Sequence, residues 1–125
     1  MSKRENIEAE RLHQALQSRS GAKGSFTRTV NKINDLMKDE ANVNAVKTEL
    51  QNLQRNFERF REYHDRYHSL LKNVEHIAQS NKYYDLTLAT FRELDNRTQD
   101  LSMKILKIMK MMLKLIKILI KKMMT

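Results

Sequence analysis

Residues 43–78 read VNAVKTELQNLQRNFERFREYHDRYHSLLKNVEHIA, and apolar side chains recur along them at alternating steps of three and four. This two-in-seven repeat extends over about five heptads, which is typical of a helix with one narrow hydrophobic seam. A single helix cannot bury such a seam against itself, so the pattern predicts pairing with another helix of the same chain or of a partner. The one fully polar position is His64. The predicted helix-pairing seam comprises Val43, Val46, Leu50, Leu53, Phe57, Phe60, His64, Tyr67, Leu71, Val74 and Ala78.

The composition indicates an all-α fold. The chain has 125 residues, no proline and two glycines, Gly21 and Gly24, so it lacks the regularly spaced turn residues of a β protein. We expect an antiparallel helical hairpin or coiled coil with a long central helix, or a small three- to four-helix bundle. The absence of cysteine excludes a disulfide framework, a thiolate nucleophile and a cysteine-based zinc site. The N-terminal residues are too polar for a secretory signal, which favours an intracellular location, cytoplasmic or nuclear.

The residues before the seam predict two helices separated by a loop. We expect a first helix over residues 1–20, and a break over residues 18–25, where two glycines and three serines disfavour a helix. Ser25 is the expected N-cap of a second helix over residues 26–38. The next turn is expected over residues 39–44, with Asn42 or Asn44 as the cap of the long helix.

The residues after the seam leave two arrangements open. The pattern weakens at residues 79–81, where Ser80 or Asn81 is the expected cap of a fourth helix. If this helix folds back, it covers the half of the seam from Phe60 to Ala78, while the second helix covers the earlier half. If it continues as a rod, the uncovered half is available for dimerisation.

The positive charge is concentrated in a C-terminal tail. Of the net charge of +9, residues 103–125 contribute seven lysines and no acidic residue, so residues 1–102 are nearly neutral. We divide the chain accordingly into a helical region, 1–102, and a low-complexity tail of Lys, Met, Ile and Leu, 103–125. No apolar run in the tail exceeds three residues, so it is a poor transmembrane span. Its lysines recur at steps of three and four: Lys104, Lys107, Lys110, Lys114, Lys117 and Lys121.

Three interpretations of the tail stay open. On a helix, most of these lysines form a stripe roughly 80° wide beside a broad apolar face. The apolar face could pack on the bundle, or the tail could bind an anionic surface, either a membrane or RNA. Alternatively, the tail is the translation of a repetitive DNA tract rich in A and T and carries no selected function.

Part of the helical region resembles a known family. The segment Arg19-Ser20-Gly21-Ala22-Lys23-Gly24-Ser25-Phe26-Thr27-Arg28-Thr29-Val30-Asn31-Lys32-Ile33 and the run Leu50-Gln51-Asn52-Leu53-Gln54-Arg55-Asn56-Phe57-Glu58-Arg59-Phe60 carry the resemblance. Across residues 14–71 the chain is similar to the N-terminal helical region of polyproteins from BEL/Pao-type LTR retrotransposons. The resemblance implies a gag-like, non-catalytic region that acts in self-assembly, or a host protein derived from one. The tail departs from the family pattern.

Several residue clusters have a chemical and a structural interpretation. His64 and His68 share a helix face and suit a metal, but no third ligand has matching spacing, so a polar seam position that adjusts pairing is favoured. Arginines and aromatic residues alternate over residues 55–67, as in nucleic-acid sites, yet the seam accounts for most of the rings. The basic loop over residues 19–28 is a weaker candidate for anion or RNA contact.

The sequence therefore predicts a non-catalytic helical interaction or assembly module that acts through its seam. Its partner would be a second copy or another helical protein. The alternative is binding to an anionic surface through the tail. We expect no enzyme, cofactor, bound metal or small-molecule substrate, because no nucleophile–base pair, phosphate loop or metal set is recognisable.

Overall fold

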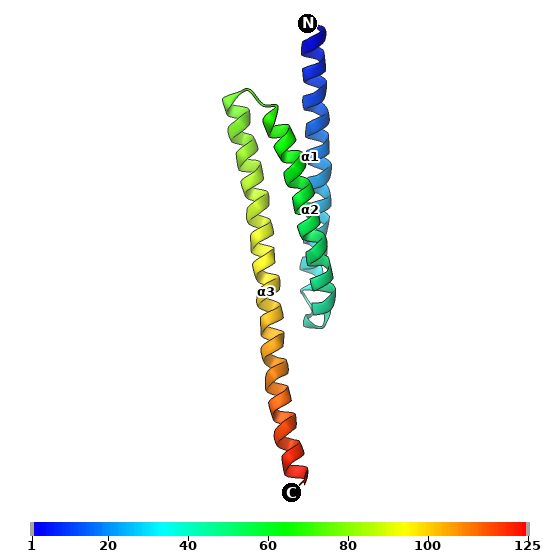
Figure 1. Ribbon diagram of the computed structural model, residues 1–125, viewed down its shortest axis with the longest axis vertical. Helices are drawn as coiled ribbons and strands as arrows, with labels where there is room; N and C mark the ends of the chain where they lie inside the picture. Colours follow the sequence, from blue (N-terminus) through cyan, green and yellow to red (C-terminus); the bar gives the residue numbers. More distant parts are fainter. Residues whose placement is uncertain (1, 125) are drawn as a thin grey trace.

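The computed structural model describes residues 2–124, and within them the chain is helical with no strand. Its elements are α1 (Lys3–Leu36), the short 3₁₀ helix η1 (Glu40–Asn42), α2 (Val43–Ser69) and α3 (Val74–Met124). Figure 1 shows α1 and α2 as an antiparallel hairpin, with α3 returning beside α2 and continuing past the hairpin's closed end. The predicted all-α class and antiparallel hairpin are confirmed.

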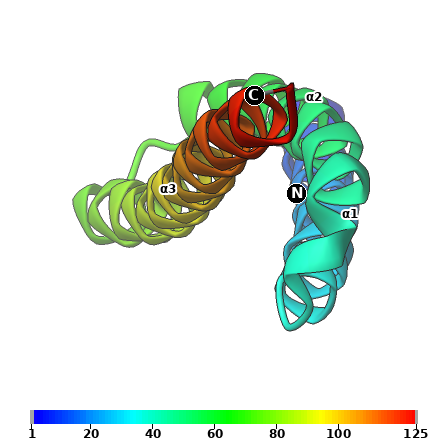
Figure 2. The ribbon, with the colours of Figure 1, turned by 90° about the horizontal axis from the view of Figure 1, so that it is seen from below.

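The central helix α2 holds the three helices together. It packs against both α1 and α3, most extensively against α1. Seen along the long axis, the helices are inclined to one another and are not parallel rods (Figure 2). The predicted fold-back of the last helix is therefore present in one chain, and the alternative continuous rod is wrong.

The first turn lies where the sequence predicts it. The Asp39 carboxylate accepts a hydrogen bond from the Ala41 backbone N–H at 2.9 Å and caps η1. Asn42 immediately precedes α2, but its side chain donates to the Leu36 carbonyl at 3.1 Å and does not cap the new helix. Asn42 thus caps the C-terminal end of α1, where backbone carbonyls lack helical hydrogen-bond partners.

The predicted loop over residues 18–25 is wrong, because α1 runs unbroken through it. Ser25 is not an N-cap here; its hydroxyl accepts from Arg28 and its carbonyl from Thr29 within the helix. Arg19, Ala22 and Phe26 are buried at helical spacing on either side of the glycines. Packing of this face outweighs the cost of about 1 kcal/mol that each glycine imposes on a helix.

The second turn also differs from the prediction. α2 ends at Ser69, and α3 begins at Val74, after Asn73 accepts hydrogen bonds from the Glu75 and His76 N–H groups at 2.8 and 3.3 Å. Ser80 and Asn81 are therefore inside a helix and cap nothing. The heptad pattern crosses this turn without interruption, so periodicity alone could not reveal it. The signal in the sequence is Asn73, whose side chain caps the start of α3.

The core lies in the middle of the bundle. Phe57 marks the place where the three helices meet, with its ring 5.9 Å from Phe26 of α1 and stacked at 4.6 Å on Phe91 of α3. Aromatic pairs at such distances add to the free energy gained by apolar burial. The buried apolar residues are Ala22, Phe26, Ile33, Val46, Leu53, Phe57, Phe60 and Leu94.

Candidate functional site: the projecting end of α3 and a buried arginine

The seam of α2 is covered by the other helices of the same chain. Five predicted seam residues are buried, and Val43, Leu50, Tyr67 and Leu71 are half-buried. Two predicted members, Val74 and Ala78, are exposed on α3, and Val74 is 80% accessible, so the seam ends with α2. The buried members are Val46, Leu53, Phe57, Phe60 and His64.

An ion pair joins α3 to the closed end of the hairpin. Lys104 Nζ lies 2.8 Å from Glu40 Oε1 of η1, and this hydrogen bond raises the pKa of Lys104. Beyond it α3 extends alone, as Figure 1 shows by the orange and red part of the ribbon. We call residues 103–124 the projecting segment.

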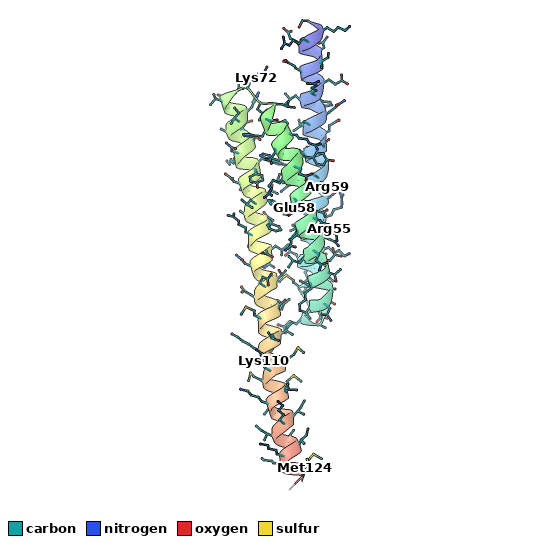
Figure 3. The ribbon with its side chains drawn as sticks, in the orientation of Figure 1. Arg55, Glu58, Arg59, Lys72, Lys110 and Met124 are labelled. Atoms are coloured by element: carbon teal, nitrogen blue, oxygen red, sulfur yellow. The ribbon has the colours of Figure 1, made fainter. Side chains whose placement is uncertain are left out.

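The projecting segment leaves its apolar side chains in water. Apart from the half-buried Ile105, every apolar residue in it is exposed, with accessible fractions from 43% at Ile108 to 85% at Met123. The interpretation that the tail packs its apolar face on the bundle is therefore wrong. Exposed apolar surface of this extent is typical of a site of association. Figure 3 shows Lys110 and Met124 on this free part of the helix.

Lysines interrupt the apolar surface along the whole projecting segment. Seven lysines and no acidic residue fall within residues 103–125. No helix among the described residues is long and apolar enough to cross a membrane. The positive side chains near the end of α3 also interact favourably with the negative end of the helix dipole.

A second unusual feature is the burial of Arg19, which the sequence assigned to a surface loop. Its guanidinium carbon lies 4.1 Å from the ring centroid of Tyr67 and 4.2 Å from that of Tyr83, so two rings contact the cation. Its Nη1 donates to Ser80 Oγ at 3.3 Å and lies 3.4 Å from His64 Nδ1. Burial lowers the pKa of Arg19, against the smaller opposing influence of the two tyrosines.

His64 and His68 belong to the same polar cluster. His64 is 4% accessible and stacks on Tyr84 at 4.8 Å, and His68 Nδ1 lies 3.0 Å from Ser80 Oγ. Burial, then Arg19 and His68, lower the pKa of His64. Within residues 2–124 no three His, Asp or Glu side chains come together as metal ligands. The two histidines thus belong to a hydrogen-bonded cluster, with His64 on the seam and His68 one turn further along α2.

The alternating arginines and aromatic residues of α2 face different directions. Phe57 and Phe60 are buried in the core, whereas Arg55 and Arg59 are exposed, as is the labelled Glu58 (Figure 3). Arg55 donates to Asn52 at 3.0 Å. The two phenylalanines are therefore not available for stacking on bases, which weakens the nucleic-acid interpretation of this segment.

Comparison with protein families, curated proteins and solved structures found no match. The resemblance of residues 14–71 to a retrotransposon gag-like region therefore stays a prediction from the sequence.

The sequence did not predict the cluster around Arg19, to which Ser80 and Tyr83 contribute from α3. A signal was present: Arg19 precedes Ala22 by three residues and Phe26 by seven, on the buried side of α1. An arginine on the same helix face as two buried apolar residues could have indicated a buried cation.

Proposed function

We propose that this chain is a non-catalytic helical interaction module that attaches to anionic membrane surfaces through its projecting segment. The observation that carries the proposal is the exposure of nearly every apolar side chain in residues 103–124, beside lysines and without one acidic residue. The bundle formed by α1, α2 and the first part of α3 serves as the scaffold that presents this segment.

The chemistry of the projecting segment fits a lipid surface. Apolar side chains enter the boundary between head groups and acyl chains, and lysines contact anionic head groups with their long side chains. The segment is about 33 Å long, but its lysines oppose a transmembrane orientation, so we expect it to lie in the plane of the surface. RNA is a poorer fit, because residues 103–125 contain no aromatic side chain to stack on bases.

The buried seam supports this choice of interaction surface. Phe57 and Phe60 of α2 already contact rings of α3, and Phe57 also contacts α1. A partner helix could reach these side chains only by displacing part of the bundle. The projecting segment needs no such rearrangement. Self-association through the same exposed apolar surface is the competing outcome of the test.

The test is co-sedimentation of the full chain with vesicles of phosphatidylcholine, with and without phosphatidylserine. We expect binding to the vesicles that contain phosphatidylserine, and weaker binding as salt rises, because salt screens the lysine charges. Replacing Lys107, Lys110 and Lys114 by Gln should weaken binding about 100-fold, since each lysine near an anionic surface contributes about 1 kcal/mol.

A matched control removes the same charge elsewhere. Lys3, Lys47 and Lys82 are exposed on α1, α2 and the bundle part of α3, and their triple replacement by Gln should leave vesicle binding nearly unchanged. Equal loss in the two triple variants would attribute binding to net charge and contradict the proposal. Sedimentation velocity without lipid tests the competing outcome. Stable oligomers that do not bind anionic vesicles would favour self-association instead.

A further inference from the structure

Membrane attachment through the projecting segment does not explain why the guanidinium of Arg19 is buried. Arg19 is 8% accessible, and its partners Ser80 and His64 carry no negative charge at neutral pH. Among the ion pairs of residues 2–124, none includes Arg19. Buried cations in proteins are normally compensated by an anion, because desolvation of an unpaired charge is costly.

One edge of this guanidinium is unsatisfied. The hydrogen bonds of Arg19 use Nη1, whereas its Nε is buried without a hydrogen-bond partner. The edge formed by Nε and Nη2 has the spacing of the two oxygens of a carboxylate. Tyr67 and Tyr83 contact the guanidinium, so its planar orientation is fixed before any ligand arrives.

A pocket of about 410 Å³ adjoins this side chain, between α1, the end of α2 and the start of α3. Its lining includes the polar residues Arg19, His76 and Gln79 and the apolar residues Leu12 and Leu71. No acidic residue lines it. Its volume falls within the range of about 300–1,000 Å³ that is usual for small-molecule sites.

We propose that this pocket binds a small organic carboxylate. The carboxylate pairs first with Nη2 of Arg19, which is not buried, and a small in-plane shift of the guanidinium between the two tyrosine rings brings Nε within reach of its second oxygen. The apolar part of the ligand contacts Leu12 and Leu71. A single planar cation favours a carboxylate monoanion over a phosphate dianion, for which clustered cations or main-chain amides are the usual partners. Ser80 stays oriented, because its hydroxyl is hydrogen-bonded to His68 at 3.0 Å as well as to Arg19.

The test is a titration of the full chain with hexanoate, followed by the backbone amide signals of Gln79 and Ser80 in nuclear magnetic resonance spectra. We expect saturable shifts with a Kd of about 1 mM or tighter. Hexanamide, which has the same shape without the charge, should bind at least tenfold more weakly. The Arg19→Met variant, with its helicity checked by circular dichroism, should lose hexanoate binding by at least tenfold.

A second pair of variants keeps the test decisive if Arg19→Met does not fold. Leu12→Glu places a negative charge on the half-exposed wall of the pocket and should weaken hexanoate binding at least fivefold. Ile7→Glu adds the same charge on α1, at a 49% accessible site outside the pocket wall and more than three turns before Arg19, and should bind as the native chain does. Equal affinity for hexanoate and hexanamide, or unchanged binding in Leu12→Glu, would overturn the proposal. Hexanoate is free in solution, so neither outcome depends on vesicle attachment.

Discussion

Replacing Phe57 by Ala tests both the seam of α2 and the fold-back of α3. Phe57 is 5% accessible and contacts rings of α1 and α3. Truncation of a buried phenylalanine to alanine costs about 3–5 kcal/mol, because the transfer free energy is lost and a cavity remains. A domain of this size has about 5–15 kcal/mol of stability in total, so the variant should lose a large fraction of it. At about 4 °C per kcal/mol, the expected fall in Tm is about 12–20 °C.

The assay is urea unfolding followed by circular dichroism, with Leu86→Ala as the control. Leu86 is 62% accessible on α3, so its truncation should change the unfolding free energy by less than about 0.5 kcal/mol. A loss below about 0.5 kcal/mol for Phe57→Ala would refute the seam assignment.

A double-mutant cycle isolates the contact between α2 and α3. The rings of Phe57 and Phe91 are stacked at 4.6 Å with an interplanar angle of 14°. We expect a coupling free energy of about 0.5–1.5 kcal/mol between Phe57→Ala and Phe91→Ala. A coupling of zero would mean that α3 does not lie on α2, and the fold-back would be refuted even if Phe57 itself proved important.

Two further predictions concern the helix α1 and the buried histidine. Gly21→Ala should raise the unfolding free energy in urea by about 0.5–1 kcal/mol, because the added Cβ meets nothing within 4 Å and alanine is the better helix former; a loss of stability would show that residues 18–25 are not helical. Because the pKa of His64 lies below its usual 6.5, the unfolded chain binds more protons below that pH, so stability should fall as the pH drops below about 6.5 and stay level above it. His64→Phe should reduce this fall in the urea midpoint, and an unchanged pH profile would contradict the assignment.

The sequence predicted the features that depend on periodic burial. Steps of three and four identified Val46, Leu53, Phe57 and Phe60, which are all buried in α2. The turn near Asp39 was also predictable, because short polar side chains there compete for backbone hydrogen bonds. These features depend on local hydrogen bonding and on one hydrophobic stripe, and both can be predicted from a single sequence.

The features that failed depend on competition between local preference and tertiary packing. Gly21 and Gly24 lower helix propensity, yet α1 continues because Ala22 and Phe26 are buried against the other helices. At the second turn the error is the opposite one: a helix was predicted to continue, and the chain breaks at residues 70–73. The heptad pattern continues across Asn73, so the pattern does not show that α2 stops at Ser69 or that the capping hydrogen bonds of Asn73 start α3 at Val74.

The bundle and the projecting segment depend on each other through the continuity of α3. An isolated helix must pay for an unfavourable first turn before it can grow. Here that cost is already met, since α3 enters the segment as a formed helix that is paired with Glu40 through Lys104. Propagation then needs only good helix formers, and Leu, Met and Lys supply them. The bundle thus supports the segment as a helix and leaves its apolar side chains exposed. With 51 residues against 27 in α2, α3 is long enough to form both the third helix of the bundle and the projecting segment.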